Sequence, residues 1–134
     1  MDITLIESKS DMGFDLYALV IEDSCQVIEY IDSVDEKNQK QIAALFGRII
    51  VKGLPHNEQK YRSLGDAIFE LKTRGGLRVL CFTGGSFLLR SLILTHAFDK
   101  PHSRILQREK KKALDWRNQY FQETVNIVDL DMEG

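Results

Sequence analysis

The chain has 134 residues, enough for one domain and too few for two independent cores. A hydrophobic fraction of 43% and a charged fraction of 28% are typical of globular domains and exclude intrinsic disorder. No apolar run approaches the roughly 20 residues of a spanning helix, and the N-terminus lacks the pattern of a secretory leader. We therefore expect a cytoplasmic protein without membrane contact. The formal net charge of −2, read over the whole chain, argues against a nucleic-acid partner.

The distribution of charge along the chain changes this first interpretation. Residues 1–36 carry ten acids and one base, whereas residues 37–120 carry seventeen Lys or Arg and six acids. Residues 121–134 carry four acids and no base. A basic middle thus lies between two acidic ends. Residues 1–15 and 121–134 are either solubilising tails or segments that fold against the basic face.

The two cysteines, Cys25 and Cys81, show no metal or redox pattern. They are 56 positions apart, without a C-x-x-C spacing. Cys81 lies in a strand-like apolar run, so we expect a buried apolar role for it.

The first half of the chain predicts a strand followed by two helices. Residues 2–7 form either a short strand or a frayed end, and residues 16–21 read as a strand. Ser24 is a plausible N-cap for a helix that reaches residue 34. A second helix with an apolar stripe is expected to stop near Gly53. We expect these two helices to form a helical hairpin.

The second half predicts three strands and a helix. The apolar runs at residues 68–72, 77–82 and 87–98 are separated by glycine turns, which favour an antiparallel meander. A helix is expected over residues 103–122, packed on the sheet, and residues 124–130 read as an edge strand or a partner contact. The predicted class is α+β: an N-terminal strand, a two-helix hairpin, a three-stranded antiparallel meander and a C-terminal helix.

A dense group of charged residues lies in FELKTRGGLRVLCF, residues 69–82. Alternate residues of a strand share a face, so Lys72 and Arg74 should project together with Glu70. The Gly-Gly turn should bring Arg78 within reach of Arg74. Because guanidinium groups bind phosphate oxygens in pairs, this arrangement predicts a phosphate site. The alternative is an exposed strand face on which Glu70 pairs with one of the cations.

Four more residues fall close to this segment in the expected fold. His96 and Lys100 lie at the end of the third strand, and Lys60 and Arg62 precede the first. His96 is two residues from Leu94, so in a regular strand the two side chains share a face. The alternative role of His96 is therefore that of a core histidine. For the other three, the alternative is a solvated loop or linker.

The last predicted helix has a basic face. Helical spacing places four cations together there: Arg104, Arg108, Lys111 and Lys112. Such a face predicts salt-sensitive contacts with rRNA phosphates, and the alternative is an ordinary solvated surface.

Several segments occur in a recognisable order. Residues 61–82 read YRSLGDAIFELKTRGGLRVLCF, residues 94–100 read LTHAFDK, and the last helix contains REKKKALDWRNQYF. In this order and spacing they resemble the RelE/ParE superfamily of bacterial toxins, most closely its HigB-like, phage-derived branch. The resemblance covers about residues 14–121 of a single domain that spans residues 1–134, and it implies a RelE-like fold.

The resemblance implies a ribosome-dependent mRNA endonuclease, the toxin of a type II toxin–antitoxin pair, which cleaves RNA without a metal or other cofactor. The ribose 2′-OH attacks the adjacent phosphate, which requires a base, an acid and fixed cations. Matched to the motifs, Lys72, Arg74 and Arg78 would stabilise the phosphate. His96 and Lys100 would be the acid and base.

The implied partners are an antitoxin of helix-turn-helix type, the ribosome and mRNA. Lys60, Arg62 and the basic face of the last helix would bind RNA. The oligomeric state is open, with a homodimer as one alternative. A second hypothesis is a non-catalytic binding protein, either a ParE-like topoisomerase inhibitor or a decayed phage protein. It is favoured by Glu70, where some relatives have a lysine, and by the lack of a tyrosine at the start of the last helix.

Overall fold

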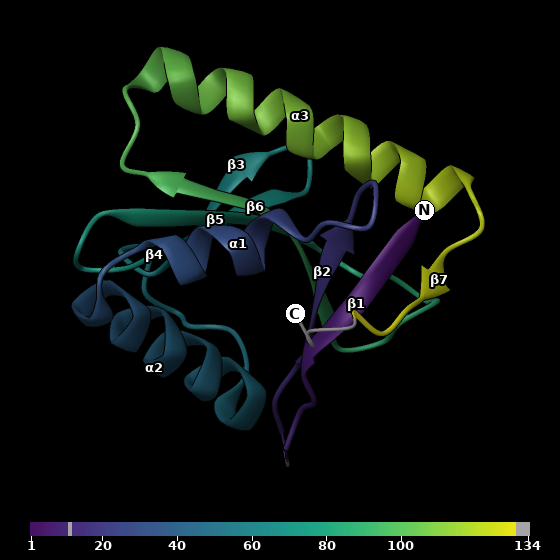
Figure 1. The fold of residues 1–134 in the computed structure, drawn as a ribbon, viewed down its shortest axis with the longest axis horizontal. Helices are drawn as coiled ribbons and strands as arrows, with labels where there is room; N and C mark the ends of the chain where they lie inside the picture. The colour runs from purple at the N-terminus through teal and green to yellow at the C-terminus, as the bar shows by residue number, and fades with distance from the viewer. Residues whose placement is uncertain (11, 131–134) are drawn as a thin grey trace.

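A mixed sheet with helices on both faces forms the framework of the chain (Figure 1). The computed structural model describes residues 1–10 and 12–130, and these contain seven strands and three helices. In chain order the elements are β1 (Asp2–Glu7), β2 (Asp15–Val20), α1 (Gln26–Ser33), α2 (Glu36–Lys52), β3 (Tyr61–Gly65), β4 (Ile68–Lys72), β5 (Leu77–Thr83), β6 (Ser91–Asp99), α3 (Ser103–Gln122) and β7 (Asn126–Ile127).

The strands follow the order β3-β4-β5-β6-β2-β1-β7. Strands β3 to β6 form an antiparallel meander, which confirms the predicted meander and adds one strand to it. Strand β2 pairs in parallel with β6, and the β1–β2 hairpin extends the sheet beyond it. Strand β7 adds a short parallel pairing to β1. Strands β3 and β7 therefore lie at opposite edges of the sheet.

Two apolar cores lie on the two faces of the sheet. One is closed by α1 and α2, where Ile42, Phe46 and Ile49 of α2 pack on the sheet. The other is closed by α3, through buried Ala113 and Tyr120. The predicted packing of the C-terminal helix on the sheet is confirmed, and Cys25 and Cys81 are buried thiols. None of the helices in the described part of the chain is both long and apolar enough to cross a membrane.

The helix boundaries follow local chemistry. The Asp35 side chain accepts a hydrogen bond from the Asn38 backbone N–H (3.0 Å) at the start of α2, and Gly53, with φ of 89°, ends that helix as predicted. The expected N-cap at Ser24 is wrong. Residue Cys25 occupies the cap of α1 instead, because the backbone of Ser24 bridges Ile21.

Two strand predictions need correction. Strand β3 was missed, because it is a polar edge strand that packs chiefly through Tyr61, whose ring stacks on Phe69 at 4.8 Å. Strand β6 begins at Ser91 and not at residue 87. In the preceding loop the side chains of Phe87 and Leu89 are 58% and 72% exposed, so that part of the apolar run is not a strand. The sheet is thus larger than the sequence predicted.

Among the described residues, neither those of 1–15 nor those of 121–130 line the hollows that hold the predicted cations. Strand β1 and residues 124–130 lie at or beside the β7 edge, where the Met1 ammonium group donates to the Thr124 carbonyl oxygen (2.9 Å). The basic strands β3 and β4 form the other edge. Residues 11 and 131–134 lie outside the described part of the chain.

Candidate nucleic-acid interface

A hollow of about 270 Å³ opens on the α3 side of the sheet, and we call it the α3-side hollow. It lies where β4 and β5 pair Lys72 with Arg78 across the two strands. Four of its lining residues were predicted site residues: Arg62, Lys72, Arg78 and Lys100. Glu70, Pro101 and Leu106 complete the lining.

A buried carboxylate organises the arginines of this hollow. The Glu70 side chain is 0% exposed, and its Oε1 accepts a hydrogen bond from Arg62 Nη2 at 2.9 Å. Arg78 Nε lies 3.5 Å from Glu70 Oε2, which has no hydrogen-bond partner. Glu70 therefore pairs with two cations, where the sequence allowed for one. Among the described residues, Lys72 and Lys100 form no ion pair, so the hollow keeps an excess of positive charge.

The environment of Lys72 favours its neutral form more than bulk water does. Partial burial lowers the pKa of the Lys72 ammonium group, and the positive charges of Arg62 and Arg78 lower it further. Glu70 and Glu58 act in the opposite direction and do not reverse the shift.

The structure corrects the placement of Arg74. Strand β4 ends at Lys72, so Arg74 lies in the turn, exposed, and does not project with Lys72 from a strand face. Register pairs Arg78 with Lys72, not with Arg74. The Gly75 backbone N–H donates to Gln41 Oε1 at 2.7 Å, which fixes the turn against α2. Arg74 therefore lines a different hollow, on the α2 side of the sheet, together with Lys60 and Lys72, and we call it the α2-side hollow.

His96 is turned toward α3 by a bulge in β6. Leu80 pairs with His96 and Cys81 pairs with Leu94, so Thr95 is an extra residue in the strand. Leu94 consequently faces the α1 and α2 core, whereas His96 faces the α3 core and does not share the parity of Leu94. His96 is 5% exposed and lines neither hollow.

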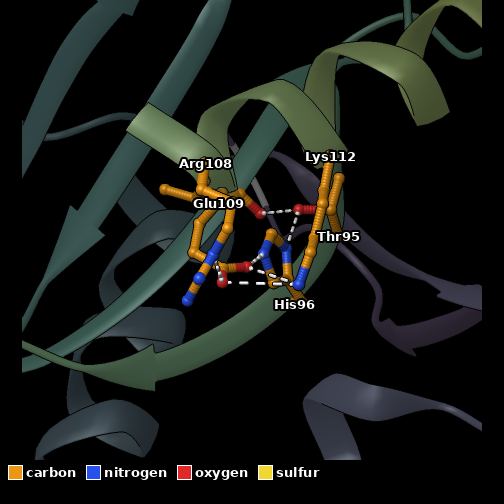
Figure 2. A network of polar contacts seen from close by, with 6 residues as sticks. Thr95, His96, Arg108, Glu109 and Lys112 are labelled. Carbon is orange, nitrogen blue, oxygen red and sulfur yellow. Dashed lines mark hydrogen bonds and ion pairs between the residues drawn. The ribbon is translucent and has the colours of Figure 1, made fainter. Parts of the chain in front are cut away.

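Both ring nitrogens of His96 have partners within a buried network (Figure 2). Nε2 lies 2.8 Å from Glu109 Oε2 on α3, and Nδ1 lies 2.9 Å from Thr95 Oγ1. Lys112 and Arg108 pair with the same Glu109 carboxylate. This geometry matches the alternative of a satisfied core histidine, and it connects β6 to α3.

The network accommodates two protonation states of His96. With a neutral ring, Nε2–H donates to Glu109 and the Thr95 hydroxyl donates to Nδ1. With a protonated ring, Nδ1–H donates to Thr95, whose hydroxyl hydrogen turns to the Leu80 carbonyl oxygen at 3.1 Å. Burial lowers the pKa of His96, although Glu109 opposes this shift. Burial raises the pKa of Glu109, but hydrogen bonds from His96 and Lys112 outweigh it and leave the pKa below its usual value.

The predicted basic face of α3 is exposed to solvent. Its four residues line neither hollow: Arg104, Arg108, Lys111 and Lys112. A neighbouring cation, Lys110, donates instead to Asp66 Oδ2 in the β3–β4 turn at 2.9 Å.

Sequence reasoning missed two groups of residues around these sites. Glu109 lies at helical spacing from Ala113, Trp116 and Tyr120. This spacing predicts that Glu109 lies on the buried face of α3, and so the sequence contained a signal for it. Gln41 and Arg48 on α2 border the α2-side hollow and lacked a comparable signal, because α2 read only as a core helix. Within the described residues, no group of three or more His, Cys, Asp and Glu side chains is placed to hold a metal ion.

The fold and the two hollows define a small α+β protein with a cationic edge on its sheet. Residues 29–118 match the family described as Phage derived protein Gp49-like (DUF891), and the chain belongs to this RelE-like family. The matched segment contains all residues that line the two hollows and the His96–Glu109 pair. No curated protein matches the chain.

Proposed function

We propose that the protein is the toxin of a type II toxin–antitoxin pair and a ribosome-dependent mRNA endonuclease of the HigB-like branch, with a RelE-like arrangement of helices and sheet. The observation that carries the proposal is the α3-side hollow, in which Lys72, Arg78 and Lys100 converge in a Gp49-like chain. A single buried carboxylate aims two guanidinium groups there and leaves two ammonium groups to bind an anion.

The reaction is an in-line attack of the ribose 2′-oxygen on the adjacent phosphorus. The bond between phosphorus and the 5′-oxygen breaks, leaving a 2′,3′-cyclic phosphate and a 5′-hydroxyl. Lys72 accepts the 2′-OH proton, since its lowered pKa increases its neutral fraction. Lys100 donates a proton to the leaving 5′-oxygen, and Arg78 stabilises the charge on the phosphorane. His96 takes no direct part and holds β6 against α3.

The partners follow from this reaction. The exposed cations of α3 contact rRNA phosphates, and an antitoxin of helix-turn-helix type covers the α3-side hollow. We place the protein in the cytoplasm, where it meets translating ribosomes, as a monomer or a homodimer.

Cleavage of message on translating ribosomes, followed by mapping of the new RNA ends, tests the proposal. Arg78→Ala should reduce the cleavage rate about a hundredfold, because it removes a group that stabilises the transition state. Lys72→Arg keeps the charge but removes the proton acceptor, so it should lower the rate by a similar factor, about a hundredfold, while binding is retained. Lys40→Gln removes an exposed charge from α2 outside both hollows and is the matched control. Intact message with the wild-type protein, or equal rates for all variants, would refute an endonuclease.

A non-catalytic binding protein is the second candidate, and the buried position of His96 favours it. A histidine with both ring nitrogens bonded is not available to exchange protons with a substrate. Strong expression without an antitoxin separates the two functions. Growth arrest with intact message and inhibited topoisomerase would support the binding protein, whereas arrest with cleaved message would support the endonuclease.

A further inference from the structure

A second hollow lies on the α2 side of the sheet, and apart from Lys72 its lining residues take no part in the reaction proposed above. It measures about 330 Å³, which is within the size range of small-ligand sites. The lining of this α2-side hollow comes from α2, the segment before β3, the end of β4 and the turn after it. It consists of Gln41, Ala44, Leu45, Arg48, Gln59, Lys60, Lys72, Thr73 and Arg74.

The charge of this hollow is of one sign. Four of its lining residues are cations, none is acidic, and none of the four forms an ion pair among the described residues: Arg48, Lys60, Lys72 and Arg74. Glu58 lies near enough to act on Lys72 but does not line the hollow. Unpaired cations at such close range repel one another unless an anion lies between them.

The lining of the hollow also contains apolar atoms and amide groups. Ala44 and Leu45 of α2 contribute apolar atoms to the lining. Gln41 uses its Oε1 to hold the Gly75 N–H, which leaves its amide nitrogen available to a ligand. Apolar atoms beside an amide donor suit a nucleobase, and the cations around them suit a phosphate.

Lys72 connects the two hollows. It lines both, and its backbone N–H donates to the Lys60 carbonyl oxygen at 2.8 Å, so these two lysines lie side by side at the boundary. A single RNA strand that crosses this boundary has cations on both sides of it.

We propose that the α2-side hollow binds one nucleotide of single-stranded RNA, adjacent to the phosphate held in the α3-side hollow. The base lies on Ala44 and Leu45, and Arg48 and Arg74 bind its phosphate. This inference rests on the proposed function in so far as RNA is the ligand, but it concerns binding and not cleavage.

The test uses a fully 2′-O-methylated RNA hexamer, which lacks the attacking hydroxyl and so reports binding alone. Fluorescence anisotropy is measured for the full chain at several salt concentrations. Arg48→Gln should weaken binding about fivefold at low salt and reduce the slope of log affinity against log salt by about 0.7, the value for one phosphate contact. Lys40→Gln, on the same helix and outside the hollow, should change affinity less than twofold.

A second measurement tests whether the nucleotide binds in the α2-side hollow itself. Addition of 5′-AMP should shift the NMR signals of the Gln41 side-chain amide in the wild-type protein and not in Arg48→Gln. Equal affinity of Arg48→Gln and Lys40→Gln for the hexamer, or unmoved Gln41 signals, would overturn the inference. Arg48-dependent binding of an oligoglutamate peptide without binding of the hexamer would also overturn it, in favour of an acidic protein partner. Arg48-dependent RNA binding by a protein that cleaves no message would support the inference and refute only the proposed reaction.

Discussion

Glu70 determines how the α3-side hollow presents its positive charge. Its carboxylate is completely buried and lies between Arg62 and Arg78, one on each neighbouring strand. The sequence indicated a basic cluster with an acid in its middle, but only the register shows that one carboxylate meets both guanidinium groups. In the sequence, Glu70 departs from the basic pattern of its segment. In the structure, Glu70 is the residue that positions two guanidinium groups, those of Arg62 and Arg78.

Replacing this carboxylate should destabilise the protein. Glu70→Gln removes both ion pairs but lets the half-exposed Arg62 return to water, so we expect a loss of about 2 kcal/mol in the free energy of unfolding. Urea unfolding measures this loss. Glu58→Gln is the control, because Glu58 is exposed and should give a change near zero. An equal free energy of unfolding for both variants would contradict the role assigned to Glu70.

His96 should make stability depend on pH. Its pKa in the folded state is lowered from 6.5, so the unfolded chain binds the proton more readily. The stability contributed by neutral His96 is complete above pH 6.5 and is lost as the pH falls through the lower folded pKa. The charged neighbours in this balance are Glu109, Lys112 and Arg108 on α3.

Urea unfolding between pH 5 and pH 8 tests this linkage. The wild-type free energy of unfolding should fall on acidification below pH 6.5, and His96→Gln should flatten that dependence whatever its own stability. Identical slopes for the two proteins would show that His96 is not the titrating group.

At the scale of elements, the contact between the β2 lead-in loop and α2 is tight. A Cβ at Gly13 would lie 1.7 Å from the Ile50 carbonyl oxygen, whereas a Cβ at Gly47, in the middle of α2, meets nothing within 4 Å. Gly13→Ala should therefore lower the free energy of unfolding by about 3 kcal/mol or more. Gly47→Ala should raise it by about 0.5 to 1 kcal/mol, because alanine favours the helix.

Thermal or urea unfolding of these two variants checks the packing of α2 directly. The two substitutions are chemically identical, so their opposite signs must come from the surroundings. A small effect at Gly13 would mean that the loop does not approach α2 as described.

Periodicity predicted the elements whose apolar residues decide their packing. Helix α2, helix α3 and the last three strands of the meander, β4, β5 and β6, follow from apolar stripes and glycine breaks. Periodicity did not predict strand β3, because an edge strand with polar residues lacks an alternating apolar pattern. The bulge at Thr95 left no trace in the sequence either, and it decides which core His96 enters.

At the scale of the whole molecule, the near-neutral net charge hides a local concentration of cations around the two hollows. Strand β1, next to the β7 edge of the sheet, carries acids of the N-terminal segment, and further acids of residues 1–36 lie on α1 and at the start of α2. The cations of the two hollows come from α2, the segment before β3, strands β3, β4 and β5, the β4–β5 turn and the residue after β6. This concentration of cations gives an anionic polymer a binding surface, although the summed charge of −2 argues against such a partner. The concentration depends on strand order and register, which composition cannot reveal.

The central claim is that the basic edge cleaves RNA by attack of the 2′-OH. The most direct test is the chemistry of the RNA ends produced when the protein is expressed without an antitoxin. Cleaved message should carry 2′,3′-cyclic phosphates upstream and 5′-hydroxyls downstream with the wild type and Lys40→Gln, and about a hundredfold less of both with Arg78→Ala. Message that stays intact, or that carries 5′-phosphates at its new ends, would contradict the claim.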